Sequence, residues 1–297
     1  MKNNYFNKLQ LCSILIVLIV VPFIGGGALS LFKSAGVDAY FSVIIGGILG
    51  VLNLFIFIYI FSYKEETSIR DKIIILFGKK FGFIINSIIC ILFFTISLFS
   101  MYNLINFIVS QFLAETPMLI IGILFSLVII YINIKGIEVM SRVILIILII
   151  NISLFLIAVL GLIPHFDFYN LKPILEFGIK RPLIGSLYVI TMNIAPIYLL
   201  LIIPKNNIIQ NDKINKWLII SYIISIIIIF TALVLTLGTL GIHLASIYQY
   251  PGYIVLKRIN LFNFLDRIEN IIIIQWIFGL YTMVSITVYY ISNTIKF

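Results

Sequence analysis

The chain has 297 residues, of which 62% are hydrophobic and only 10% are charged, and its mean hydropathy is +1.21. A soluble domain of this length could not bury so much apolar surface, whereas lipid accepts apolar side chains on every face of a helix. Continuous apolar runs without strict alternation also argue against a membrane β-barrel. The composition therefore predicts an all-α polytopic membrane protein that forms one domain over residues 1–297.

Eight apolar runs are long enough to cross about 30 Å of hydrocarbon at about 20 residues each. They cover residues 9–32, 38–62, 82–110, 118–134, 140–163, 183–203, 215–242 and 268–292. Most of the Lys and Arg residues fall on one side when the N-terminus is placed in the cytoplasm, so we predict that orientation. The net charge of +9 then indicates contact with anionic lipid headgroups and not with nucleic acid.

The first run contains the sequence "VVPFIGGGALSLF", in which Pro22 precedes the consecutive glycines Gly25, Gly26 and Gly27. Proline removes a backbone donor, and each glycine lowers helix stability by roughly 1 kcal/mol. The sixth run has a comparable interruption in "TMNIAPIY", at Asn193–Pro196. Matching interruptions five helices apart predict an inverted-repeat transporter fold, in which helices 1 and 6 unwind to bind a small ligand. The competing interpretation is a proline kink with small residues for close packing.

Glycines in the second run have a different interpretation. Gly46 and Gly50 are four residues apart, and with Gly47 they form a small face suited to a helix crossing. We therefore predict that these glycines are packing residues.

Polar side chains share one helical face in three of the runs. They are Thr95, Tyr102, Asn103, Asn106 and Ser110 in the third run, Ser221, Ser225, Thr236 and Thr239 in the seventh, and Gln275, Thr282, Ser285 and Tyr289 in the eighth. Because amides and hydroxyls need partners in hydrocarbon, each face is predicted to point into the bundle. For any single residue, an ordinary interhelical hydrogen bond is the competing interpretation. No ionisable residue lies at the centre of a run, which indicates a zwitterionic or neutral ligand held by helix termini.

Three connections are long. The 63–82 connection mixes charges with apolar intervals, which predicts a helix at the cytoplasmic interface. The outward connections 165–182 and 243–266 offer surfaces for a partner or a gate. The sequence "FLDRIEN" (264–270) is either a solvated boundary with local ion pairs or a docking element, and the sequence leaves both open.

The sequence gives no sign of an enzyme, a metal site or a cofactor. Cys12 and Cys90 both lie within apolar runs and are expected to be small packing residues. There is no nucleophile elbow, phosphate-binding loop outside a membrane run, or metal-ligand spacing.

Four stretches carry a resemblance to a known family: "QLCSILIVLIVVPFIGGGAL", "GVDAYFSVIIGGILG", "LFGKKFGFIINSI" and "LGTLGIHLASIYQYPGYIVLKRINLFNFLDRIENIIIIQWIFG". The last is the most specific, through its "YPGY" and "LDRIE" patterns. The chain resembles the spore germination permease family, the B subunits of nutrient germinant receptors, in the amino acid–polyamine–organocation superfamily. Members often carry a glutamate in the middle of helix 6, and "MNIAPIY" has none.

The resemblance implies a ten-helix transporter-like fold in the spore inner membrane, of which eight helices are present. It implies an amino-acid-like germinant, an A-type membrane subunit and a C-type lipoprotein subunit as partners. The expected function is that of a receptor B subunit. The alternatives are an amino-acid permease working by alternating access and a structural subunit that binds no ligand. The expected ligand-binding residues are Gly25, Gly26, Gly27, Tyr102, Asn106, Asn193, Ala195, Gln275 and Thr282.

Overall fold

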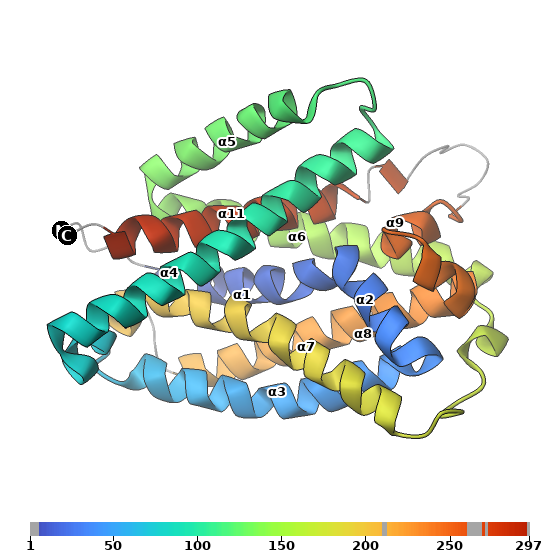
Figure 1. Ribbon diagram of the computed structural model, residues 1–297, viewed down its shortest axis with the longest axis horizontal. Helices are drawn as coiled ribbons and strands as arrows, with labels where there is room; N and C mark the ends of the chain where they lie inside the picture. The colour runs from blue at the N-terminus through green and yellow to red at the C-terminus, as the bar shows by residue number, and fades with distance from the viewer. Residues whose placement is uncertain (1–5, 210–212, 260–268, 271–272, 296–297) are drawn as a thin grey trace.

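The protein is an elongated bundle of helices in a computed structural model that describes residues 6–209, 213–259, 269–270 and 273–295 (Figure 1). The α-helices are α1 (Lys8–Pro22), α2 (Ala28–Ala35), α3 (Ala39–Ser62), α4 (Ile69–Gln111), α5 (Met118–Lys135), α6 (Ile137–Leu162), α7 (Lys180–Leu199), α8 (Ile214–Ile247), α9 (Pro251–Leu256) and α11 (Ile274–Ile295). Two short strands, β1 (Phe6–Asn7) and β2 (Ile208–Ile209), pair in parallel.

Seven helical stretches among the described residues are long and apolar enough to cross a membrane. This confirms the prediction of an all-α polytopic membrane protein. The number of these stretches is smaller than the eight predicted runs for two reasons. Helix α1 has only 15 residues, and α2, which has 8, continues through a short 3-10 turn into α3. The first predicted run is therefore two shorter helices in succession.

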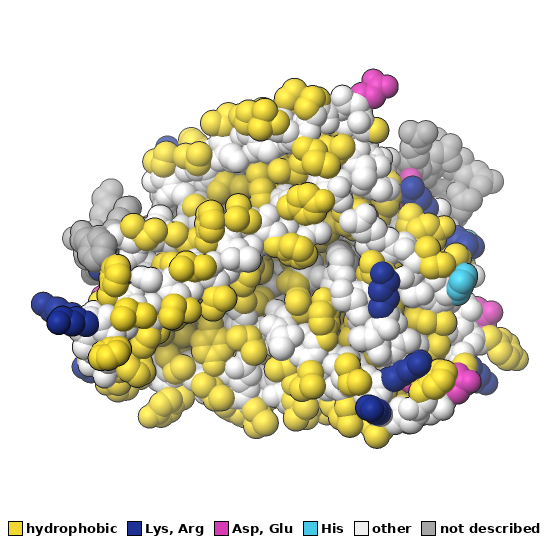
Figure 2. Space-filling model, in the orientation of Figure 1, with side chains coloured by type: hydrophobic (Ala, Val, Ile, Leu, Met, Phe, Trp, Pro, Cys, Tyr) yellow, Lys and Arg dark blue, Asp and Glu magenta, His cyan; other side chains and the backbone are white. Residues whose placement is uncertain are grey.

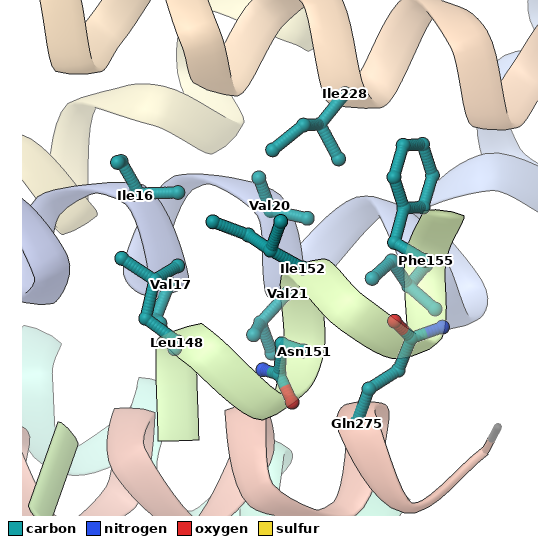
Figure 3. A pocket seen from close by; sticks show the side chains of 11 residues that line it. Ile16, Val17, Val20, Val21, Leu148, Asn151, Ile152, Phe155, Ile228 and Gln275 are labelled. Atoms are coloured by element: carbon teal, nitrogen blue, oxygen red, sulfur yellow. The ribbon is translucent and has the colours of Figure 1, made fainter. Parts of the chain in front are cut away.

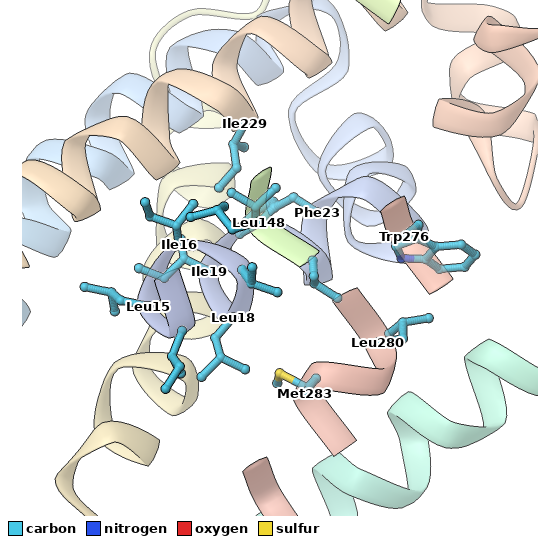
Figure 4. Packing of buried hydrophobic residues seen from close by; sticks show 14 of the residues in the cluster. Leu15, Ile16, Leu18, Ile19, Phe23, Leu148, Ile229, Trp276, Leu280 and Met283 are labelled. Atoms are coloured by element: carbon cyan, nitrogen blue, oxygen red, sulfur yellow. The ribbon is translucent and has the colours of Figure 1, made fainter. Parts of the chain in front are cut away.

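Helix α1 lies at the centre of the bundle, in contact with α6, α7, α8 and α11. Every residue from Leu11 to Val21 is buried, which fits a helix that is apolar on all sides. Figure 4 shows side chains of α1, among them Leu18, packed between Ile229 of α8 and Met283 of α11. The interruption in α1 therefore lies inside the protein and not against lipid.

The interruption that the sequence predicts in the first run is present at the expected place. The chain does not unwind there: Phe23–Gly27 forms one π-helical turn, η1, between α1 and α2. A π-turn is rare and is concentrated at functional sites. Gly27 suits this turn because a Cβ on it would overlap the carbonyl oxygen of Pro22.

The second predicted interruption is wrong. Helix α7 continues through Asn193–Pro196 and ends only at Leu199. Pro196 lies in the last turn, so its missing N–H removes a single bond, to the carbonyl of Met192, and the buried ring packs in the core. The matched breaks that motivated the inverted repeat are therefore absent, and the inverted repeat itself stays a prediction.

The glycines of α3 pack against neighbouring helices, as predicted. A Cβ on Gly46 would lie 2.7 Å from Cβ of Val189 in α7, and one on Gly47 would lie 2.7 Å from Ile226 in α8. Gly50 faces the hydroxyl of Tyr222, which donates to the carbonyl of Gly47 at 3.1 Å. Small side chains on α3 let it approach both helices closely.

The 165–182 connection after α6 is held on the bundle. The amide nitrogen of Asp167 and the side chain of Asn170 both donate to the carbonyl of Gly238 in α8, at 3.0 and 2.8 Å. The buried carboxylate of Asp38 accepts from the amide of Leu175 at 2.9 Å. Residues 260–268 of the second connection, with most of "FLDRIEN", lie outside the described residues.

Polar contacts join several segments at the end of the bundle where α4 begins. Lys205 pairs with Glu65, and the buried ammonium of Lys72 donates to the carbonyls of Ile60 and Phe61 at 2.8 and 3.2 Å. These two carbonyls belong to the last turn of α3, which a helix leaves without internal partners. Lys72 thus caps the end of α3 from α4. Helix α4 begins at Ile69, so the 63–82 connection contains a helix, as predicted.

Replacing Lys72 by methionine is expected to lower the free energy of unfolding by about 1–3 kcal/mol, because it removes charged hydrogen bonds from two buried carbonyls. The control is Lys79→Met, an exposed lysine seven residues further on, which we expect to change stability by less than about 0.5 kcal/mol. Thermal unfolding of both purified variants measures the difference, and equal effects would contradict the capping role.

Candidate functional site

Two small cavities adjoin the π-turn, on the side where α1 meets α6, α8 and α11. The first has a volume of about 30 Å³ and is lined by side chains of α1 and α6, with Ile228 of α8 and Gln275 of α11 (Figure 3). The second, of about 60 Å³, extends along η1 toward α9. Ile24, Phe155 and Gln275 line both cavities, so the two form one continuous region around the turn.

The polar side chains of the first cavity are two neutral amides. Asn151 of α6 and Gln275 of α11 both line the first cavity, where α6 and α11 meet beside α1 (Figure 3). The Oδ1 atom of Asn151 is buried and has no hydrogen-bond partner among the described residues. Gln275 is only 7% exposed. A buried acceptor without a partner is unfavourable, so this site is suited to a guest that donates a hydrogen bond.

The remaining lining is apolar, with Val17, Val20, Ile24 and Phe155 around the amides. Thr236 lines the second cavity, but its hydroxyl donates to the carbonyl of Ala232 in its own helix at 2.8 Å. None of the described lining residues is charged. The region therefore offers hydrogen bonds and apolar contact but no ion pair, and it has room for a few water molecules in this conformation.

The predicted glycines of the first run lie in the turn next to this region, and its Phe23 and Ile24, not the glycines, are the lining residues. Gly26 and Gly27 belong to η1, and the backbone of Gly25 lies in the same turn. A Cβ on Gly26 would have no neighbouring atom within 4 Å, so this glycine borders open space. Gln275 lines both cavities, in agreement with the prediction that the polar face of the eighth run points into the bundle.

Three predicted residues are buried elsewhere. Asn193 of α7 is fully buried beside the Tyr222 hydroxyl, which donates to the carbonyl of Gly47. Ala195 is half-buried against the core, and the hydroxyl of Thr282 donates to the carbonyl of Phe278 in its own helix at 2.9 Å. The structure does not place these three on the cavities, because the unbroken α7 turns Asn193 toward α8 and Thr282 lies two turns beyond Gln275.

Tyr102 and Asn106 are also separate from the cavities. Tyr102 is 58% exposed and lines an outer groove of about 520 Å³ between α4 and α5. Asn106 donates from Nδ2 to the hydroxyl of Tyr250 at 2.8 Å. The prediction of an inward polar face is therefore wrong for Thr95, Tyr102 and Ser110, which are exposed, whereas Asn106 makes the ordinary hydrogen bond of the competing interpretation.

Aromatic packing explains the orientation of α4. Phe107 is buried. The centroid of its ring lies 4.6 Å from that of Trp276 and 5.0 Å from that of Tyr250, and both pairs are edge to face. Such pairs add stability beyond the buried area, so the aromatic face turns inward and the polar face outward. The polar faces of the seventh and eighth runs do point into the bundle, as predicted: Ser221, Ser225, Thr236, Thr239, Gln275, Thr282 and Ser285 are all buried, and Tyr289 is half-buried against the core.

Sequence reasoning missed the contribution of α6. Asn151 and Phe155, one helical turn apart, face the cavity, and neither was among the expected site residues. The available signal was a single amide in the middle of the 140–163 run, where a polar side chain needs a partner or a function.

These features define a polytopic helical membrane protein whose central helix has a π-turn beside an uncharged, amide-lined cavity. Comparison with known proteins gives the family. The model of the family described as "Spore germination protein" matches residues 10–297, so the chain belongs to this family and has a germination-related role.

Individual relatives agree with this assignment at low identity. Spore germination protein KB of Bacillus subtilis (strain 168) is 26% identical over 285 residues, which cover 93% of this chain and 74% of that protein. Spore germination protein XB of Bacillus anthracis is 20% identical over 266 residues, with 90% and 74% covered. Spore germination protein A2 of Bacillus subtilis (strain 168) is 23% identical over 280 residues, with 92% and 76% covered.

Proposed function

We propose that this protein is the B subunit of a nutrient germinant receptor in the spore inner membrane, and that it senses a small amino-acid-like molecule. Membership of the spore germination protein family supports the biological role. The observation that supports the site is the pair of amides, Asn151 and Gln275, facing a cavity beside the only π-turn among the described residues.

The chemistry of the cavity favours a ligand with hydrogen-bonding groups and a small apolar part. Each amide donates and accepts, and Asn151 has an unused buried acceptor. The apolar lining accommodates an aliphatic portion. Net charge is disfavoured since no charged side chain is available among the described lining residues, and this fits a zwitterion or a neutral molecule.

The size of the cavity explains how binding becomes a signal. Cavities of about 30 and 60 Å³ are far smaller than the roughly 300 Å³ of a typical ligand pocket. A nutrient therefore enters only when α6 or α11 moves away from α1. Binding then favours the opened arrangement over the closed one, which is the differential affinity that a two-state sensor requires.

In this proposal the N-terminus faces the cytoplasm, and partner subunits detect the helix movement. The partners are an A-type membrane subunit and a C-type lipoprotein, as the resemblance implies. The outward connection that is fixed to Gly238 and Asp38 offers a rigid surface to such a partner.

The second candidate is a permease that carries its ligand across the membrane. Transporters coupled to protons or sodium usually place an ionisable group or a dense group of carbonyls on the pathway. The amide-lined cavity has no ionisable side chain among its described residues, which favours sensing.

Binding and uptake measured on the same preparation test the proposal. We expect that an amino-acid panel contains at least one member that raises the unfolding temperature of the purified protein. We expect no sustained uptake of that amino acid, as a radiolabel, into proteoliposomes. Uptake against a gradient would support the permease instead, and a panel without any stabilising member would contradict ligand sensing.

A further inference from the structure

The start of α4 is a helical hairpin that projects from the end of the bundle (Figure 1). The chain turns at Gly78, whose φ of 77° is one that glycine adopts without strain. The two arms touch closely, since a Cβ on Gly82 would lie 2.9 Å from Cα of Ile74. Asn86 donates to the carbonyl of Arg70 at 3.3 Å and ties the arms together. We call residues 69–86 the α4 hairpin.

One side of the α4 hairpin is fixed to the bundle. Lys72 and Ile73 are buried, and Lys72 caps the last turn of α3. The opposite side and the tip thus have a fixed position relative to the membrane helices.

The tip of the α4 hairpin exposes large apolar side chains. Leu76 is 60% exposed, Phe77 is 56% exposed and Phe81 is 70% exposed. These residues lie on both sides of the turn at Gly78. Exposed apolar groups of this size, concentrated at one place, indicate a surface that meets another apolar phase.

Two cations lie between these apolar residues. Lys79 and Lys80 are exposed, and neither forms an ion pair in the part of the chain that the structure describes. Figure 2 shows Lys and Arg side chains projecting from this end of the bundle. The one acidic residue of the hairpin sequence, Asp71, lies at its other end, where its carboxylate accepts from the hydroxyl of Ser68 at 3.0 Å.

We propose that the tip of the α4 hairpin binds anionic phospholipids. Leu76, Phe77 and Phe81 enter the boundary between headgroups and acyl chains, and Lys79 and Lys80 contact lipid phosphates. Apolar side chains next to lysines are the composition of elements that lie in the membrane interface, and each lysine near an anionic surface adds attraction. The tip leads directly into the membrane-spanning part of α4, so a lipid surface is within reach without any other partner.

An environment-sensitive fluorophore at position 77 tests this inference. The label is attached to Phe77→Cys in a chain with Cys12→Ala and Cys90→Ala, and the protein is placed in nanodiscs of phosphatidylcholine with increasing phosphatidylglycerol. We expect the emission to shift to shorter wavelength, and aqueous iodide to quench it less, as phosphatidylglycerol increases.

The role of the lysines is tested with two charge-matched variants. Lys79→Gln combined with Lys80→Gln is expected to weaken the apparent affinity for phosphatidylglycerol by about tenfold or more, because each lysine contributes about 1 kcal/mol at an anionic surface. The control, Lys213→Gln combined with Lys216→Gln, removes the same charge from exposed positions at the start of α8 and should change the affinity by less than about twofold.

Two results would overturn the inference. The first is an emission spectrum and iodide quenching that indicate water around the label at every phosphatidylglycerol content. This result would favour a protein partner for the exposed tip. The second is an equal loss of affinity in both charge variants, which would show that the total charge of the protein, and not the hairpin, attracts the lipid.

Discussion

Gly27→Ala is expected to lower the unfolding temperature by about 2–12 °C. A Cβ at this position would overlap the Pro22 carbonyl oxygen and would lie 3.0 Å from its carbonyl carbon, and both are backbone atoms that cannot move aside alone. Overpacking of this kind costs about 1–3 kcal/mol, and each kcal/mol corresponds to about 2–4 °C in a chain of this size.

The matched control is Gly26→Ala in the same π-turn. A Cβ there meets no atom within 4 Å, and alanine is favoured over glycine in a helix by about 1 kcal/mol. We therefore expect an unchanged or slightly higher unfolding temperature. If both variants lose stability equally, the π-turn at Phe23–Gly27 is not the structure of this segment.

Gln275→Leu is expected to weaken ligand binding by about tenfold or more without lowering the unfolding temperature of the free protein. Leucine has a similar size and suits the apolar lining, but it removes a hydrogen bond to the ligand, and a lost bond at a buried site costs about 1–3 kcal/mol. Isothermal titration of the amino acid that stabilises the protein most gives the affinity.

Tyr102→Phe is the control for this variant. Tyr102 faces the outer groove between α4 and α5, so removal of its hydroxyl should leave the affinity unchanged. A loss of affinity in Tyr102→Phe with none in Gln275→Leu would move the site to the outer groove.

The membrane class and the position of the first interruption could be predicted from the sequence, because both depend on local composition. Apolar runs set the spans, and Pro22 with Gly25–Gly27 marked the end of α1. Whether such a segment unwinds or forms a π-turn depends on the helices packed around it. That information is not local, and the prediction of an unwound helix was wrong in this respect.

The sixth run shows the opposite error. The sequence predicts a break in mid-helix at Pro196, but this proline lies in the last turn of α7, where a missing donor affects only one carbonyl. A proline shows where a helix is weakened. The sequence does not show how far the helix continues when neighbouring helices bury it.

Helical periodicity predicted that α4 has a polar and an apolar face, but not which of them points inward. In α8 and α11 the polar face is inside, and in α4 the aromatic contacts of Phe107 with Trp276 and Tyr250 bring the other face inside. Those partners lie far along the chain, so the pattern of α4 alone does not contain the answer. Sequence reasoning missed Asn151 for the same reason, since only the packing of α6 against α11 brings it to the same cavity as Gln275.

The most direct test is protection of a cysteine in the cavity by the ligand. Val20→Cys, in a chain with Cys12→Ala and Cys90→Ala, places a thiol of nearly the same size on the first cavity, and Ile123→Cys places one in the outer groove. With a saturating mixture of the standard amino acids other than cysteine, a membrane-permeant thiol reagent should modify Cys at position 20 several-fold more slowly, and position 123 at an unchanged rate. An unchanged rate at position 20, or equal slowing at both positions, would contradict a nutrient site beside the π-turn.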